Sequence, residues 1–380
     1  MFTSFCFNGT LIFKFNNITV MNRKIKFFMA NTAYSPLGRQ IVRWLRIPKL
    51  YADYMAWFSR RKALAIAKKE FSKETAIGSL DDYKHALEKH WVSYNEYAYQ
   101  YEFFDKTEEE REEYISREKM GYFYRRYSPV NARAIFRNKN RFLTKFSKSI
   151  HRNWIYTPEA SYEEFAQLVS NYDCIIKPCD GAFGRGIFKV YKNGDHTDDR
   201  KMYDSCVKDR MLVEQCIESC EELKALHPQS LNTIRVVTIA NKEKACVFSG
   251  VLRTGVGDSV VDNSHNGGVS VQINVENGVV ETDGANTKGE RFISHPDSGI
   301  VFKGFKIPKW DLIVKTCCEA AKMTDNPITG WDVAINSNGD VEFVEANYAP
   351  DMDMMQTRFK AGAKKKIYSL IREYCGIEMR

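Results

Sequence analysis

The sequence predicts an α+β protein with a helical N-terminal region followed by a domain of strands and helices. In residues 38–127, apolar residues recur every three to four positions with charged residues between them, which is the period of amphipathic helices. After about Asn131, short apolar runs lie between turns and helices, which indicates strands. Asn338-Gly339 separates two late runs and strongly indicates a β-hairpin. We therefore expect a mainly helical region at 1–130 and a second domain at 131–380.

Composition is typical of a soluble globular protein. The chain has 380 residues, enough to bury a large core, with 44% hydrophobic and 27% charged residues. No apolar run reaches the roughly 18 residues of a membrane span. Ten cysteines show no Cys-x-x-Cys pair or zinc-like spacing, which favours reduced thiols and a cytoplasmic location. The pattern of the first 20 residues matches poorly with that of the next segment, so Met21 is an alternative start.

Positive charge is concentrated near the N-terminus. The net charge is +8, and residues 1–75 contain 14 lysines and arginines but three acidic residues, a local charge of about +11. Residues 38–75 form a basic helical stretch that Pro48 breaks or kinks. The simpler interpretation is a packed helix with a solvated basic face. The alternative is a peripheral contact with anionic lipid at the inner face of a membrane. No basic–aromatic motif accompanies the charge, so we expect no nucleic-acid partner.

Three oxygen-bearing side chains gather on one face of the predicted hairpin. A two-residue type I′ turn at Asn338-Gly339 pairs Asp332 with Glu345 and places Asn347 on the same face. Facing carboxylates repel, and a Mg²⁺ ion bound to oxygen ligands explains their proximity. A solvated face that carries two acids by chance explains it equally well. If the pair repels, replacing either acid by its amide preserves or raises the stability of the metal-free protein.

A glycine-rich turn is predicted between two strand-forming runs. Gly181, Gly184 and Gly186 let backbone N–H groups approach an anion closely. No Gly-Lys-Ser/Thr comes after it, which excludes a P-loop, and the strand that comes next excludes a Rossmann fingerprint. Lys177, at the root of the turn, is a candidate counter-charge for phosphate. An ordinary hairpin turn is an equally good explanation.

Two arginines stand on otherwise apolar predicted strands. Arg235 lies within Thr233–Ala240, and Arg253 ends the run Ala245–Arg253. Each occupies either a solvent-facing edge position or a place where a guanidinium binds carboxylate or phosphate.

The order of these features resembles the ATP-grasp superfamily. The features are a lysine before a glycine-rich strand–turn–strand, a hinge strand, arginine-bearing strands, and Asp…Glu-x-Asn on a late hairpin. NTIRVVT, NGGVSVQI, and GWDVAI…VEFVEAN with PDMD after it resemble more closely the sugar-transfer-associated ATP-grasp proteins of surface-polysaccharide gene clusters. The resemblance covers about residues 90–375. Pro350-Asp351 stands where many ATP-grasp ligases have Pro-Gly, and no α/β domain is visible before the core.

This resemblance implies an ATP-grasp fold, with lobes at about 131–210 and 211–380 that clamp ATP. It implies ATP and Mg²⁺ as cofactors, and ligation of a small-molecule carboxylate to an amine, with sugar-linked substrates, through an acyl phosphate. A kinase for a sugar or related acceptor is the alternative on the same scaffold. By the resemblance, Lys139 and Lys177 contact ATP phosphates, Gly181, Gly184 and Gly186 belong to a flap, Glu214, Gln215 and Ile217 hold adenine, and Glu221 contacts ribose. Arg235 and Arg253 face the transferred groups, and Asp332, Glu345 and Asn347 bind Mg²⁺.

Overall fold

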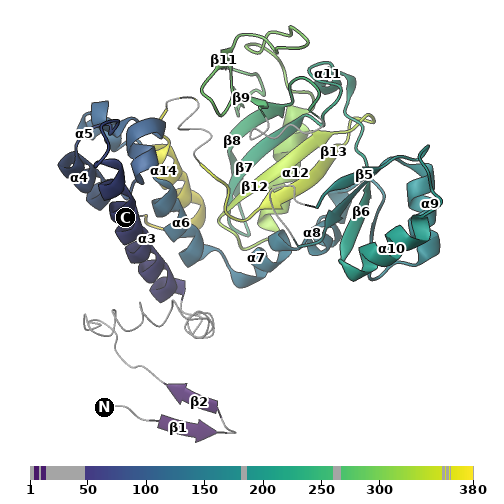
Figure 1. Ribbon diagram of the computed structural model, residues 1–380, viewed down its shortest axis with the longest axis horizontal. Coiled ribbons are helices and arrows are strands. Elements are labelled where there is room, and N and C mark those ends of the chain that lie inside the picture. The colour runs from purple at the N-terminus through teal and green to yellow at the C-terminus, as the bar shows by residue number, and fades with distance from the viewer. Residues whose placement is uncertain are drawn as a thin grey trace.

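The computed structural model describes residues 4–7, 10–13, 48–180, 186–259, 267–352, 356, 359 and 361–379. Helices and antiparallel sheets are both present, as predicted, and the helices come first within residues 48–145. A two-stranded sheet of β1 (Ser4–Phe7) and β2 (Thr10–Phe13) precedes them and stands apart in Figure 1. Within the described residues, no helix combines the length and apolarity needed to cross a bilayer.

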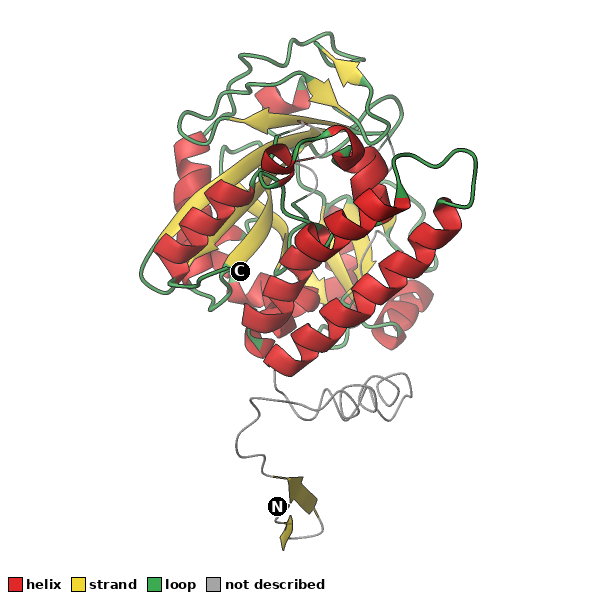
Figure 2. Ribbon diagram, turned by 90° about the vertical axis from the view of Figure 1, so that its left-hand side faces the viewer, coloured by secondary structure: helices red, strands yellow, loops and turns green. Residues whose placement is uncertain are grey.

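The helical region is built from short helices around α3 (Pro48–Glu70), the longest of them. Pro48 is the first described residue of α3, and the preceding part of the predicted basic stretch, residues 38–47, lies outside the described residues. Figure 2 shows these helices in front of the sheets. The others are α4 (Leu80–His90), η1 (Glu96–Gln100), η2 (Phe103–Asp105), α5 (Glu108–Arg111), α6 (Arg117–Tyr127), α7 (Val130–Arg137), α8 (Lys139–Lys145) and η3 (Ser147–Ser149). The predicted boundary at 130/131 falls at the start of α7, and the division into domains stays a prediction.

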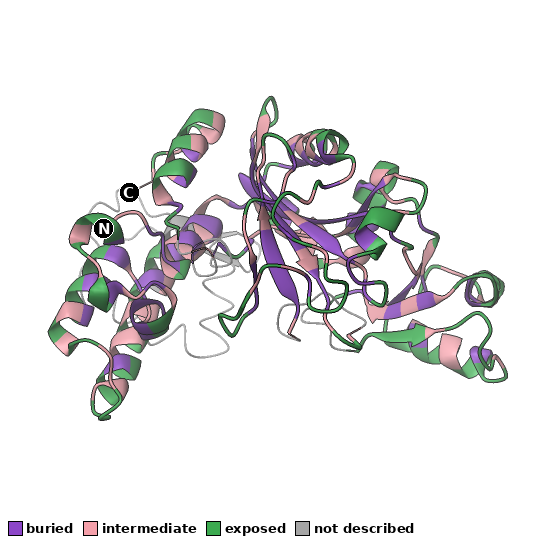
Figure 3. Cartoon of the chain, turned by 90° about the horizontal axis from the view of Figure 1, so that it is seen from above, coloured by how far each residue is buried: buried purple, intermediate pink, exposed green. Residues whose placement is uncertain are grey.

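A seven-stranded antiparallel sheet forms the centre of the molecule. Its strand order is β11-β10-β9-β8-β7-β12-β13. Its central strands are buried in Figure 3, and Trp331 stacks on Phe343 with ring centroids 5.0 Å apart. Helices α12 (Trp310–Lys322) and α14 (Lys364–Cys375) pack on it. The strands are β7 (Thr233–Ala240), β8 (Ala245–Thr254), β9 (Val269–Ile273), β10 (Gly284–Ala285), β11 (Arg291–Phe292), β12 (Ile328–Ile335) and β13 (Val341–Asn347).

A four-stranded antiparallel sheet lies beside the large one, on the right in Figure 1. Its order is β3-β6-β4-β5, and α9 and α10 lie at its outer side. Phe165 of α9 packs into a core with Ile176 and Val213 of the sheet. The elements are β3 (Trp154–Tyr156), α9 (Tyr162–Asn171), β4 (Cys174–Pro178), β5 (Phe188–Val190), α10 (Asp199–Lys208) and β6 (Met211–Gln215). The short helix α11 (Glu221–Lys224) follows β6 and packs in the core of the large sheet through Leu223.

The turn between β12 and β13 differs from the predicted two-residue type I′ turn. A type I′ turn needs positive φ at both central residues. Gly339 has φ 81°, but Asn338 is not in the left-handed region. The Asn336 N–H donates to the Asp340 carbonyl at 3.1 Å, and the Gly339 N–H donates to the Asn336 carbonyl at 2.9 Å. The loop is therefore longer than predicted, and only its glycine adopts the left-handed conformation.

A β-bulge compensates for this longer loop. Next to the loop, Ile335 pairs with Val341, one position away from the predicted register. The register then shifts between Asp332 and Val333, so that Asp332 pairs with Glu345 as predicted. A bulge adds one residue to one strand and so shifts the register by one, which restores the predicted pairing beyond it. The predicted pairing of the two carboxylates is confirmed, although the predicted turn is wrong.

Candidate functional site

Charged side chains share one face of the large sheet. Successive strand residues point to opposite faces, and the neighbours of Asp332, Trp331 and Val333, belong to the hydrophobic core. Asp332 therefore points to the other face, where the registers also place Arg235 of β7 and Glu345 of β13. Because these strands are adjacent, local strand pairing brings the three side chains together.

Asp332 is buried and held by two arginines. Its Oδ2 lies 2.9 Å from the Nη2 of Arg235, whose Nε also donates to Oδ1. The Nη2 of Arg253 lies 3.0 Å from Oδ1 and donates to the Thr233 hydroxyl at 2.7 Å. Burial works to raise the pKa of Asp332, but the charges of the two guanidinium groups lower it below the usual range. Both arginines occupy interior strands, so the solvent-facing edge interpretation is wrong.

The charge of Asp332 is compensated without a metal ion. Arg235 and Arg253 already compensate its charge, and Glu345 shares a hydrogen bond with its carboxyl group. Although the Glu345 residue as a whole is exposed, the loss of water around its carboxyl group and the negative charge of Asp332 raise the pKa of that group. The pair is therefore unequal: Asp332 is the ionised partner, and Glu345 is held toward its protonated form.

The hairpin still offers donors that suit a hard divalent cation. Two carboxylates and the Asn347 amide oxygen are oxygen ligands of the kind that Mg²⁺ prefers. Glu345 and Asn347 are exposed, whereas both oxygens of Asp332 are engaged by arginines. The Asn347 oxygen accepts the Ala349 N–H at 2.9 Å. The residues therefore fit a magnesium ion, and Glu345 and Asn347 are its accessible ligands.

A second buried ion cluster joins the two sheets, and sequence patterns did not reveal it. Arg152 precedes β3 and donates through Nε to Glu214 of β6 at 2.7 Å. Its Nη1 pairs with Glu342 of β13 and donates to the Phe343 carbonyl at 2.8 Å. Lys177 of β4 places its ammonium 2.7 Å from Glu214. Arg152 and Glu342 lie 190 residues apart in sequence, and no local motif marks either residue.

Two of the predicted adenine contacts, Glu214 and Gln215, already bind other side chains of the protein. Glu214 is buried, with its carboxylate between Lys177 and Arg152. Burial works to raise its pKa, but the charges of Lys177 and Arg152 lower it. The Gln215 side chain accepts hydrogen bonds from Asn153, including one at 2.9 Å from the amide. Glu214 therefore has a fixed ionic contact with Lys177.

Lys139 brings a second ammonium group near Lys177. It opens α8, and its N–H donates to the Cys179 carbonyl at 3.0 Å, next to the end of β4. Burial lowers its pKa, and the charge of Lys177 lowers it further, while Glu345 and Glu214 work to raise it. Two ammonium groups that repel each other gain from an anion between them. Lys139 thus lies under the electrostatic influence of both sheets.

The remaining predicted nucleotide contacts stay predictions. Gly181 and Gly184 lie outside the described residues. Gly186 has φ 73°, and a Cβ there would lie 3.2 Å from Pro178, so this position at the end of the predicted flap favours glycine. Ile217, just after β6, is half-buried. The predicted ribose contact Glu221 is exposed on α11, 3.9 Å from Lys224.

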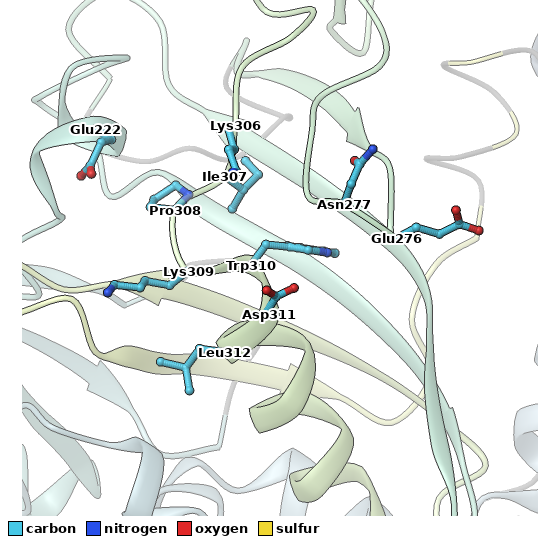
Figure 4. A pocket seen from close by; sticks show the side chains of 10 residues that line it. All are labelled: Glu222, Glu276, Asn277, Lys306, Ile307, Pro308, Lys309, Trp310, Asp311 and Leu312. Carbon is cyan, nitrogen blue, oxygen red and sulfur yellow. The ribbon is translucent and has the colours of Figure 1, made fainter.

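Two adjoining surface hollows lie at the start of α12 rather than at the charged face. Figure 4 shows the first, where Lys309 and Trp310 lie opposite Glu222. The Trp310 indole N–H is already bound to the Val275 carbonyl at 3.0 Å. Glu221 lines the second hollow with the hairpin loop. None of the predicted metal ligands lines either hollow, and neither do Lys139, Lys177, Arg235 or Arg253, so neither hollow identifies the reaction centre.

In the helical region, one histidine and two glutamates lie close enough together to be considered as metal ligands. Ligand atoms of His90, Glu108 and Glu112 all lie within 4.8 Å of one another. The ammonium of Lys89 lies 2.6 Å from Glu108 and 3.4 Å from Glu112. This amine already compensates the two carboxylates, so the group is better explained as an ion-pair cluster.

Comparison with solved structures finds partial similarity to ATP-grasp ligases and related enzymes. The ATP-grasp ligase PsnB complexed with minimal precursor matches with 13% identity over 65% of this chain and 64% of that chain, with a TM-score of 0.42. N5-carboxyaminoimidazole synthetase from Staphylococcus aureus, complexed with ADP, matches with 10% identity over 68% and 58%, with a TM-score of 0.42. Biotin carboxylase from Campylobacter jejuni matches with 14% identity over 65% and 48%, with a TM-score of 0.41. The chain thus spans less than two thirds of each of these proteins.

Sequence comparison adds the family. No curated protein matches the chain. The family model described as sugar-transfer associated ATP-grasp matches residues 119–370, which include both charged clusters. The match covers most of the chain and begins within the last helices of the N-terminal region. The protein therefore belongs to the sugar-transfer associated ATP-grasp family.

Proposed function

We propose that the protein is an ATP-dependent ligase that joins a carboxylate to an amine through an acyl phosphate. Its substrate is a sugar or an amino-acid substituent in surface-polysaccharide synthesis. One observation carries the proposal: Lys139 and Lys177 lie near Glu345, on whose face Arg235 and Asp332 also lie. Cationic groups arranged around a carboxylate cluster suit the charge of a transferred phosphoryl group. Family membership supports ATP as the phosphoryl donor.

In this proposal, the cationic side chains hold and polarise the reacting groups. Lys139 and Lys177 attract the phosphates of ATP, and Glu214 orients Lys177 through their contact of 2.7 Å. A substrate carboxylate oxygen attacks the γ-phosphorus, so that ADP leaves and an acyl phosphate forms. Arg235 and Arg253 stabilise the negative charge on the transferred group. The amine then attacks the acyl carbon, loses a proton and expels inorganic phosphate.

Magnesium has a defined place in this scheme. Glu345 and Asn347, with Asp332 behind them, would hold the ion on the exposed side of the hairpin. When bound, Mg²⁺ neutralises charge on phosphate oxygens and makes phosphorus more electrophilic. Asp332 meanwhile keeps Arg235 and Arg253 directed at the site through its ion pairs.

Trapping the acyl phosphate tests the proposed reaction. The protein is incubated with ATP, Mg²⁺ and a panel of sugar acids and amino acids, with hydroxylamine as a surrogate amine. A hydroxamate formed together with stoichiometric ADP supports the ligase. A stable phosphorylated sugar instead establishes the kinase alternative. If no acceptor in the panel increases ADP formation above the acceptor-free rate, the proposal fails for these substrate classes.

The Lys177→Met variant tests the phosphate contact. Methionine keeps much of the aliphatic stem but removes the charge, while Arg152 still compensates Glu214. Loss of a charge-assisted hydrogen bond of roughly 1.5–3 kcal/mol lowers ATP affinity about 10- to 150-fold. Calorimetric titration with a non-hydrolysable ATP analogue measures the effect. Lys201→Met, on the exposed surface of α10 in the same part of the chain, is the control. Equal affinities of the two variants would falsify the assignment of Lys177.

A further inference from the structure

The outer side of α3 carries large apolar side chains among basic ones, unlike the outer side of an ordinary solvated helix. On its inner side, Ala52, Ala56 and Ala67 are buried, and the helix packs against α6. Figure 1 shows α3 at the edge of the molecule, far from the two large sheets. We call its exposed side the basic face of α3. The basic face consists of Trp57, Arg61, Lys62, Ile66, Lys68 and Lys69.

The charges on the basic face are not balanced by neighbouring acids. Lys62, Lys68 and Lys69 form no ion pair within the part of the chain that the structure describes. Asp53, the exposed acid of α3, accepts a hydrogen bond from the Tyr122 hydroxyl at 2.9 Å. Glu70, at the far end, pairs with Lys73 at 2.7 Å. The basic face therefore presents four cations whose positive potential is available to a partner.

Two apolar side chains lie among these cations. Trp57 is 37% exposed and Ile66 is 46% exposed, at opposite margins of the basic face. The guanidinium of Arg61 lies over the Trp57 ring at 5.0 Å from its centroid. Tryptophan favours the boundary between lipid headgroups and acyl chains, and arginine favours the phosphates above it. This combination matches a lipid surface better than the phosphates of a nucleic acid, which offer no apolar layer for Ile66.

The sequence before α3 reinforces this charge. Residues 1–47 contain seven lysines and arginines and no acidic residue. They precede α3 directly in the sequence and carry charge of the same sign. Each basic residue near an anionic leaflet strengthens binding by roughly fivefold, and salt weakens the effect.

We infer that the basic face of α3 docks this protein on an anionic lipid bilayer, with cations over phosphates and Trp57 at the headgroup boundary. The apolar inner side of α3 stays packed on the protein, so the contact is peripheral and needs no unfolding of the helix. Docking goes beyond the proposed ligase activity and does not depend on it.

Vesicle co-sedimentation of the full chain tests this inference. The vesicles are phosphatidylcholine alone, or phosphatidylcholine with 30 mol% phosphatidylglycerol as the anionic probe (about one anionic lipid in three). The triple variant Lys62→Gln/Lys68→Gln/Lys69→Gln should bind anionic vesicles about 100-fold more weakly than the parent. The matched control is Lys201→Gln/Lys208→Gln/Lys322→Gln, whose lysines lie on α10 and α12. It removes the same charge and should bind like the parent.

Further measurements distinguish the other occupants of this face. Trp57→Phe should lower the quenching of tryptophan fluorescence by brominated lipid, which a purely electrostatic contact would leave unchanged. Equal binding to neutral and anionic vesicles overturns the inference. The inference is also overturned if the triple variant binds vesicles as strongly as the parent protein. In that case the basic face of α3 would not contribute, and residues 1–47 would explain the binding. Loss of duplex-RNA binding in the triple variant, with vesicle binding retained, would assign the face to nucleic acid instead.

Discussion

Each of the two buried ion clusters compensates buried carboxylates with arginine, but the two are assembled differently. In the first, Asp332 is compensated by Arg235 and Arg253, and all three lie on adjacent strands of one sheet. In the second, Arg152 holds Glu214 of the small sheet and Glu342 of the large one. Strand order and register within one sheet assemble the first cluster. The second exists only when the two sheets are correctly placed, so it reports on their relative position.

Their surroundings differ as well. Arg235 and Arg253 retain 16% and 13% side-chain exposure, whereas Arg152 retains 3%. Removing one partner of a buried ion pair leaves the other charge uncompensated, and the cost grows with the loss of water. We therefore expect Arg152 to matter most for stability, and the Asp332 cluster to matter more for chemistry.

Arg152→Met is the most severe test of this comparison. The variant leaves Glu214 and Glu342 buried without their shared cation. The free energy of unfolding should fall by about 3–5 kcal/mol, as measured by urea denaturation. Arg200→Met, at an exposed position on α10, should change it by less than about 0.5 kcal/mol. A loss below about 1 kcal/mol in Arg152→Met would mean that the cross-sheet cluster does not hold the sheets together.

Asp332 and Glu345 should respond in opposite directions. Asp332→Asn leaves two arginines without their counter-charge, so the ligand-free protein should lose about 2 kcal/mol, less than Arg152→Met because water reaches the arginines. This reverses the expectation from sequence that the amide preserves or raises stability. Glu345→Gln removes an acid that is already held toward its neutral form, so stability should stay level or rise. Both variants should lose ATP-dependent activity. Thermal unfolding and ADP release measure the two effects, and equal destabilisation by both variants would contradict the unequal pair.

The ion-pair cluster at Glu108 is partly exposed, so we expect it to contribute less to stability than either buried cluster. Partial burial works to raise the pKa of this acid, but hydrogen bonds from Lys89 and His90 lower it to about 2 from the usual 4.5. A depressed folded-state pKa stabilises the protein above the unfolded value, and the stabilisation is lost as pH falls from about 4.5 to about 2.

Acid titration of stability measures this contribution. Solvent screening limits it to about 1 kcal/mol. Glu108→Gln should therefore lower stability at pH 7 by that amount and make the parent and variant converge by about pH 2. Glu109→Gln, at the next position of the same helix turn, should show no such convergence. Parallel pH profiles for parent and Glu108→Gln would remove the ion-pair explanation of this cluster.

Local patterns in the sequence determined much of the fold and part of the site. The helical period of the N-terminal region and the alternation of short strands reflect interactions among near neighbours, and both are confirmed. The pairing of Asp332 with Glu345 is also correct, although the longer loop and the bulge contribute opposite shifts. The order of the Lys, Arg and Asp…Glu-x-Asn features also predicted the correct family. Order along the chain does not depend on which turn type or strand register forms locally.

Only the tertiary structure decided what surrounds each charge. The family resemblance assigned Glu214 to adenine binding, but its burial between Lys177 and Arg152 depends on a residue 62 positions away. The compensation of Asp332 by two arginines likewise requires the strand order β8-β7-β12, which no local pattern specifies. Coulomb interactions act through space with strengths set by distance and burial. The sequence by itself thus determined which charged groups the protein has, and folding decided which of them neutralise one another and which remain available to a ligand.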